Sequence, residues 1–409
     1  MSRYIRQGPN EILRENWVVA RERLRASEAD DSTAIDLFGA IGGSAKCREL
    51  AAAFYARAGK DPVLGPLFPG KTHKCAVEEL AAFLAQFLGG PSKDAQRRWW
   101  LSLRESHLRF QIGQKERNAW IEIMTRTLRD VEMSEPMRSA LTELFAEASA
   151  YVVNTGPAVT MEPPQPAPTH VHTQLRHRWE QQRALDEAVA AVREGELNRV
   201  TALVEGPLLQ SCFERSRSVY AQFVGVLIGS DRDVMALYAQ RTLLENPDLA
   251  HERYSSRRLL HAAAAAGNLP IVASLLGLGV DANVLDGGDH TPLYSVGNEC
   301  SAGGGPVVRA LIQGGARVDA CDGVKRCTAL HMAARRDNVE VAEALLECDA
   351  YIEVRDSLGE TPLRRAVNCG KVAVAAFLLA KGADPLSIGS RGLTPRSAAR
   401  TREMRCLFP

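Results

Sequence analysis

A tetrapeptide that recurs about every 33 residues constrains the fold of this chain more than any other feature. Three clear copies are Thr291-Pro292-Leu293-Tyr294, Thr328-Ala329-Leu330-His331 and Thr361-Pro362-Leu363-Arg364. A fourth copy begins at Thr394-Pro395, and Arg258-Leu259-Leu260-His261 is a weaker one. The starts at 258, 291, 328, 361 and 394 are separated by 33, 37, 33 and 33 residues, and we interpret Cys300–Gly305 as a loop insertion in the long interval. A fixed period of this length predicts stacked helical repeats.

Each copy continues into an alanine-rich segment, a polar turn, a Leu-Leu segment and a Gly-Ala/Val-Asp turn. Period and motif together resemble the ankyrin repeat over residues 256–409. The resemblance implies a solenoid of helix pairs that presents a concave surface to a protein partner. It assigns no chemistry to His261 and His331, because their place in the tetrapeptide favours structural hydrogen bonds to the neighbouring turn.

The segment before these repeats has the same rhythm without the tetrapeptide. Leu185 to Gly206 reads as helix–turn–helix around Glu194–Leu197, and Phe223 to Leu244 repeats the pattern around Gly229–Asp231. We therefore expect residues 176–255 to form degenerate ankyrin-like units or an N-terminal cap.

A proline-rich stretch marks the clearest domain boundary. It holds five prolines, at positions 157, 163, 164, 166 and 168, and few large apolar side chains. This composition favours extended backbone, so we predict a semi-rigid linker over residues 155–175. Such a linker transmits conformational change poorly, which favours localised ligand chemistry over tight allostery. Residues 1–31 are predicted to be a polar helical extension without chemistry.

Residues 32–154 are predicted to be almost entirely helical, because apolar residues recur at spacings of three and four between Gly and Pro breaks. His107 lies near the end of a short predicted helix, just before Gly113, and is surrounded by aromatic residues. His73 is the other histidine of this segment and stands in a polar run. Alone, a histidine in such a context is more often structural than a metal ligand.

Several landmarks of this segment resemble truncated haemoglobins. Ala40–Gly43, Ala53–Tyr55 and Asp61–Pro69 are similar to the family's first helices, and Phe83–Pro91 is similar to the end of its E helix. His107–Ile112 and Glu116–Trp120 resemble its proximal segment and the helix that follows. The Gly-Gly-Pro sequence and Trp120 point to the second of the family's three groups. The resemblance implies an all-α chain in which a truncated globin, a two-over-two helical sandwich, precedes the ankyrin solenoid.

Carried over position by position, the resemblance implies a non-covalent haem b with a pentacoordinate-type iron and His107 as its protein ligand. Tyr55 and Trp120 match distal hydrogen-bond donors, and Ala76 matches the small distal gate. The remaining cofactor-binding positions implied are apolar: Phe68, Leu80, Phe83, Phe110 and Ile112. Two neutral donors in a dry pocket stabilise the partial negative charge of bound oxygen, so we expect slow oxygen release.

Departures from the family pattern keep an alternative open. Ser106 stands where a basic residue usually precedes the proximal histidine, Glu79 stands at a usually basic rim position, and Trp99-Trp100 replaces a more polar pair. Arg104, Arg109 or Lys74 could then anchor the haem propionates. The leading hypothesis is a haem protein that scavenges or senses oxygen or another diatomic ligand. The alternative is an interaction scaffold whose globin no longer binds haem. Nitric oxide dioxygenase or peroxidase-like activity on the same iron stays open.

Composition limits the partners and the compartment. The formal net charge of +1 provides no overall positive potential that would attract nucleic acid. The sequence has no stretch of about 18 apolar residues, so it predicts no membrane-spanning helix. Nine scattered cysteines without a C-x-x-C motif argue against a disulfide framework and fit a reducing compartment. No apolar run of the signal-peptide type is present near Met1, so we expect a cytoplasmic protein.

Overall fold

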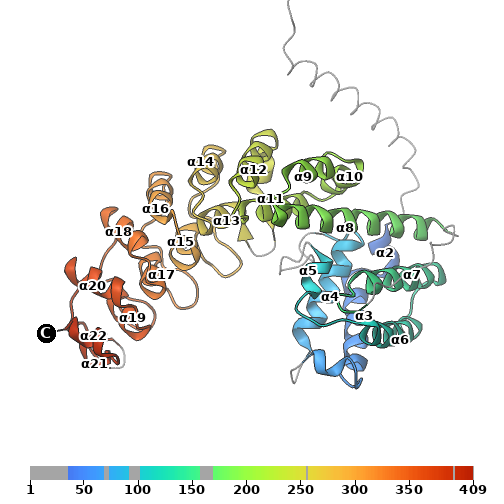
Figure 1. The fold of residues 1–409 in the computed structure, drawn as a ribbon, viewed down its shortest axis with the longest axis horizontal. Helices are drawn as coiled ribbons and strands as arrows, with labels where there is room; N and C mark the ends of the chain where they lie inside the picture. Colours follow the sequence, from blue (N-terminus) through green and yellow to red (C-terminus); the bar gives the residue numbers. More distant parts are fainter. Residues whose placement is uncertain are drawn as a thin grey trace, which may run out of the picture.

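The computed structural model describes residues 36–68, 73–91, 102–156, 169–254, 257–389 and 392–408. The predicted N-terminal extension, most of the predicted linker and Trp99-Trp100 lie outside these ranges. The expectation of an all-α chain is confirmed (Figure 1). In the described ranges the only strands are β1 (Arg253–Tyr254) and β2 (Arg257–Arg258), a short antiparallel pair. Within the same ranges no helix is both long and apolar enough to cross a lipid bilayer.

The N-terminal domain is a set of short and medium helices divided by the glycines and prolines of the sequence. Its elements are α2 (Leu37–Ile41), α3 (Gly43–Ala58), the 3₁₀ turn η1 (Gly65–Leu67), α4 (Lys74–Phe87), α5 (Leu103–His107), α6 (Gln114–Asp130) and α7 (Glu135–Tyr151). Gly42 separates α2 from α3 with φ of 104°, a backbone conformation that favours glycine. Helix α3 packs against α4 and α6, and α6 packs against α7.

The core of this domain comes from the apolar periodicity of its helices. Phe54 of α3, Leu84 of α4, Met124 of α6 and Leu141 of α7 are all buried. They belong to one apolar cluster that forms the core of the domain.

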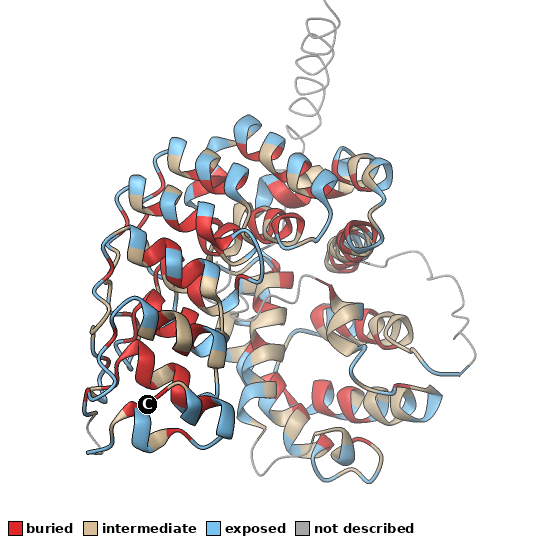
Figure 2. Ribbon diagram, turned by 60° about the vertical axis from the view of Figure 1, so that its left-hand side comes forward, coloured by how far each residue is buried: buried red, intermediate tan, exposed pale blue. Residues whose placement is uncertain are grey.

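The repeat domain consists of stacked helix pairs. Its helices are α9 (Leu197–Val204), α10 (Pro207–Arg215), α11 (Arg217–Ile228), α12 (Asp233–Glu245), η3 (Pro247–His251), α13 (Leu259–Ala265), α14 (Leu269–Gly277), α15 (Pro292–Glu299), α16 (Gly304–Gln313), α17 (Ala329–Arg336), α18 (Val339–Glu347), α19 (Pro362–Asn368), α20 (Val372–Ala380), α21 (Pro395–Ala398) and α22 (Arg402–Cys406). Figure 2 shows buried segments where neighbouring helices meet and exposed segments on their outer sides.

The tetrapeptide recurs because each copy begins a helix. The hydroxyls of Thr291, Thr361 and Thr394 accept hydrogen bonds from backbone N–H groups three residues later, which caps α15, α19 and α21. His261 and His331 each donate from Nε2 to a backbone carbonyl oxygen before the next tetrapeptide, at 2.9 Å in both cases. These histidines therefore bind successive repeats together.

Helix α8 (His170–Glu194) joins the two domains as one uninterrupted helix (Figure 1). It begins inside the predicted linker of residues 155–175, so the last part of that segment is helical. Leu175 and Trp179 in its first half belong to the N-terminal core, whereas Leu185 and Val189 in its second half belong to the repeat core. One rigid element therefore takes part in both cores.

Candidate functional site

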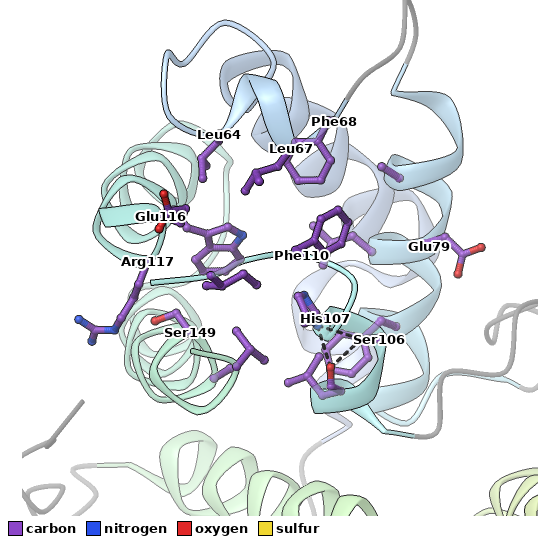
Figure 3. Close-up of a pocket in the computed structure, with 18 of the residues that line it drawn as sticks. Leu64, Leu67, Phe68, Glu79, Ser106, His107, Phe110, Glu116, Arg117 and Ser149 are labelled. Atoms are coloured by element: carbon purple, nitrogen blue, oxygen red, sulfur yellow. Dashed lines mark hydrogen bonds between the residues drawn. The ribbon is translucent and has the colours of Figure 1, made fainter. Parts of the chain in front are cut away.

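A cavity of about 400 Å³ lies inside the N-terminal domain, bordered by α3, α4, α5, α6 and α7 (Figure 3). Its volume is within the usual range of small-molecule sites in proteins. The structure brings all nine sequence-predicted site residues to its wall: Tyr55, Phe68, Ala76, Leu80, Phe83, His107, Phe110, Ile112 and Trp120.

His107 is the last residue of α5 and enters the cavity from one side. Its Nδ1 lies 2.7 Å from the carbonyl oxygen of Leu103. Because a carbonyl oxygen only accepts, Nδ1 carries the proton of the neutral ring. Burial lowers the pKa of His107, and the nearby Arg109 acts in the same direction against the opposing hydrogen bond to Leu103. Above pH 6.5 the ring is therefore neutral, and its Nε2 lone pair has no hydrogen-bond partner among the described residues.

Ser106 supports this orientation of His107. Its hydroxyl donates to the Leu103 carbonyl oxygen at 2.6 Å and lies 2.8 Å from Nδ1 of His107. In the sequence, Ser106 stood out only as the absence of a basic residue. The pattern of a serine beside a histidine gave no signal for this role, because the contact depends on how the short helix ends.

Tyr55 and Trp120 form the hydrogen-bonding part of the wall. The ring centroid of Phe54 lies 5.1 Å from that of Tyr55 and 5.2 Å from that of Trp120, so both side chains are held beside the same buried ring. Burial raises the pKa of Tyr55 to about 12, which keeps its hydroxyl protonated at neutral pH. Neither the Tyr55 hydroxyl nor the Trp120 indole makes a hydrogen bond with the described part of the chain.

Aromatic rings make up much of the remaining wall. Phe68 lies with its ring centroid 5.2 Å from Tyr55 and 6.0 Å from Phe110, and the Phe110 ring lies 6.4 Å from the His107 ring. Ala76, on the first turn of α4, presents only a methyl group. The interior is consequently apolar, with one imidazole and two neutral donors.

Charged side chains stand at the edges of the cavity. Figure 3 draws Glu79 at one edge and Glu116 with Arg117 at the other. Of the three cations considered from the sequence as propionate anchors, Arg109 lines the cavity, whereas Arg104 and Lys74 are absent from its described wall. The Arg104 guanidinium instead lies over the Tyr151 ring, 5.7 Å from its centroid.

The donor set decides which cofactor fits. Among the described residues no group of three or more His, Cys, Asp or Glu side chains could hold a metal ion unaided. A metal at Nε2 of His107 would need its other ligands from a cofactor. A flat apolar macrocycle that carries its own nitrogen ligands fits this cavity, because the wall is aromatic and supplies one imidazole.

Two family models match the chain. The one described as bacterial-like globin matches residues 36–154, and the one described as ankyrin repeats (3 copies) matches residues 259–356 and 298–388. Group 2 truncated hemoglobin YjbI of Bacillus subtilis (strain 168) is 29% identical over 106 residues, which cover 26% of this chain and 80% of that protein.

Other similar proteins match over a smaller share of their length. The nuclear factor NF-kappa-B p105 subunit of Mus musculus is 35% identical over 129 residues, which are 31% of this chain but only 13% of that protein. Alpha-latrotoxin-Lt1a of Latrodectus tredecimguttatus is 34% identical over 125 residues, 30% of this chain and 9% of that protein. The chain combines a truncated globin domain, over residues 36–154, with ankyrin repeats over residues 259–388.

Proposed function

We propose that the globin domain holds a non-covalent haem b through Nε2 of His107 and binds oxygen or another diatomic ligand, while the repeats bind a protein partner. The observation that carries this proposal is the state of His107. Burial lowers the pKa of its ring, its Nδ1 lies against the Leu103 carbonyl oxygen, and its Nε2 has no hydrogen-bond partner among the described residues at the cavity wall. That is the state in which an imidazole ligates a metal.

When bound, the haem iron supplies the metal to which a diatomic ligand attaches. The residues of this chain would do the rest. Ser106 and Leu103 hold the imidazole in one orientation. Tyr55 and Trp120 would donate hydrogen bonds to a ligand with partial negative charge, and the aromatic wall would exclude water, which strengthens such bonds. Arg109 would pair with a propionate at the cavity edge.

The repeats supply the protein-binding part of the proposal. Apolar side chains are exposed in the loops before successive tetrapeptides: Leu285 at 43%, Val324 at 97% and Leu358 at 51%. Repeated apolar positions on one set of loops support docking of a protein. A cytoplasmic location belongs to the same proposal and rests on the scattered cysteines of the sequence.

An absorbance scan tests the haem site. Purified protein supplemented with haem should show a Soret band, and ferrous protein should shift it on addition of carbon monoxide. The His107→Ala variant should lose or strongly alter this spectrum, whereas His170→Ala, at an exposed position of α8, should leave it unchanged. A wild-type protein that stays colourless favours the scaffold alternative, and an unaltered spectrum in His107→Ala removes His107 as the ligand.

A further inference from the structure

We propose that Asp186 of α8 is a positioning residue for His107, and that α8 thereby couples the ligand state of the globin cavity to the repeat domain. This inference rests on the proposed function, because His107 is taken as the haem ligand. It concerns a carboxylate outside the globin segment to which neither the sequence pattern nor the family match points.

Asp186 is held against the first residues of α5. Its Oδ1 accepts the backbone N–H of Leu103 at 3.0 Å, and its Oδ2 accepts the backbone N–H of Arg104 at 3.1 Å. Gln182 also donates to Oδ1, at 2.7 Å, and the Tyr151 hydroxyl contacts the same carboxylate. Asp186 is only 3% exposed, so every one of these bonds forms where water does not compete.

A buried carboxylate is costly unless its oxygens are satisfied. Burial raises the pKa of Asp186, and the hydrogen bonds from Arg104, Gln182 and Leu103 oppose that rise. If Asp186 left this contact, its carboxylate and the N–H groups of Leu103 and Arg104 would lose their hydrogen-bond partners. The loss of these bonds favours the contact seen in the structure.

Leu103 connects Asp186 to His107. Its N–H donates to Asp186, and its carbonyl oxygen accepts the Nδ1 proton of His107 at 2.7 Å. Helix α5 has five residues, too few to be stable by itself, so its geometry depends on such outside contacts. Ser102 adds a cap by accepting the N–H of Glu105. A displacement of His107 that keeps its bond to the Leu103 carbonyl must consequently move α8 or break the bonds to Asp186.

A second contact runs in parallel. Glu105 of α5 forms an ion pair of 2.6 Å with Arg193, in the last turn of α8. The two contacts lie seven positions apart along α8, so α5 touches this helix at two points about two turns apart.

Helix α8 carries the contact to the repeats. With 25 residues it is about 37 Å long. Its second half buries Leu185, Ala188 and Val192 in the repeat core, next to α9 and α10. Asp186 follows Leu185 directly, so the residue that holds α5 stands where the helix passes from one core into the other. Allosteric coupling between two sites typically changes affinity about 5- to 150-fold, and it is reciprocal, so a partner on the repeats would alter ligand affinity by the same factor.

The experiment compares the variants Asp186→Asn and Glu187→Gln. An amide offers one acceptor oxygen, so the introduced side chain would place its NH₂ group against one of the two N–H donors. Glu187 is exposed and pairs with Arg199, so its variant controls for the loss of a negative charge on α8. Asp186→Glu, which keeps the carboxylate but displaces it, serves as a second variant if Asp186→Asn does not fold.

Amide-resolved hydrogen exchange on the haem-free full-length chain is the first measurement. We expect about tenfold faster exchange at Leu103 and Arg104 in Asp186→Asn, an intermediate increase in Asp186→Glu, and no change in Glu187→Gln. Exchange at Leu103 and Arg104 that is equal to wild type in both Asp186 variants overturns the positioning role. This result does not depend on whether the chain binds haem.

The second measurement tests the coupling in the haem-loaded protein, with carbon monoxide as the ligand. Exchange in α9 and α10 should differ between the unliganded and carbon monoxide forms of the wild type, and this difference should shrink in Asp186→Asn while persisting in Glu187→Gln. Identical exchange in the two wild-type forms overturns the coupling. A colourless wild type contradicts the proposed function, and with it the coupling, whereas the haem-free result on Asp186 remains.

Discussion

Removing the Tyr55 hydroxyl should speed the release of oxygen from the haem-loaded protein. The change is Tyr55→Phe, which keeps the ring and its packing against Phe54 and Phe68 and deletes only the donor. Because burial raises the pKa of Tyr55 to about 12, the hydroxyl is a neutral donor throughout the range in which the protein is handled. It has no hydrogen-bond partner in the described chain that would compete with the ligand.

The magnitude follows from the type of bond. A hydrogen bond to a charged group contributes about 1.5–3 kcal/mol, and each 1.4 kcal/mol corresponds to a factor of about ten. Deleting the donor should therefore raise the oxygen dissociation rate about 10- to 150-fold. Trp120 remains as a second donor and should keep the effect in the lower part of this range.

Stopped-flow displacement of oxygen by carbon monoxide measures this rate directly. Tyr351→Phe is the matched control, because Tyr351 is 61% exposed in the repeat domain and the same atom is removed. The reasoning is refuted if Tyr55→Phe binds haem normally and releases oxygen within twofold of the wild-type rate.

Three further perturbations test the fold. Burial lowers the pKa of His261 and His331 below the ordinary 6.5, so in mildly acidic solution the unfolded chain binds more protons than the folded chain. The stability that these two histidines contribute is therefore complete above pH 6.5 and falls as the pH drops below it. Urea unfolding of the repeats should accordingly show a lower midpoint at about pH 5.5 than at about pH 7.5. Gly267→Ala should destabilise the repeats by about 1–3 kcal/mol, because φ is 68° and the added Cβ would lie 2.1 Å from a backbone carbonyl oxygen, whereas Gly277→Ala, which meets nothing within 4 Å, should not. Trp179 lies outside the matched globin segment but belongs to the globin core, so Trp179→Ala should lower the unfolding free energy of the globin domain by about 3–5 kcal/mol. An unchanged melting curve of the globin domain would contradict the place of Trp179 in that core.

The repeat architecture could be predicted from the sequence because the same helix start recurs in it at a fixed period. Each Thr at the start of a tetrapeptide stands directly before a helix, and the hydroxyls of Thr291, Thr361 and Thr394 cap it, so the period of the motif is the period of the structure. The grouping of Tyr55, His107 and Trp120 could also be anticipated, but only through the register of a resemblance. Apolar periodicity alone assigns these residues to helices and does not say which of them share a cavity.

The role of α8 could not be predicted in the same way. The sequence predicted a boundary over residues 155–175, yet Leu175 at its end and Trp179 beyond it pack into the globin core. An amphipathic pattern shows that a helix has a buried side, but not which of two neighbouring cores receives it. The contact of Asp186 with α5 could not be predicted either, because a single acidic residue within a helix usually faces solvent. Its partners here are backbone N–H groups 82 and 83 positions away in the sequence.

The shared helix also bears on how the chain can be divided. A fragment that stops before residue 169 would leave the sites of Leu175 and Trp179, which are 2% and 4% exposed in the whole chain, open to water. A fragment that starts there would carry the same two side chains without a cover. The point at which this protein can be cut into autonomously folding pieces therefore does not coincide with the change in amino-acid composition, and exchange of either domain for an unrelated one would have to rebuild one side of α8.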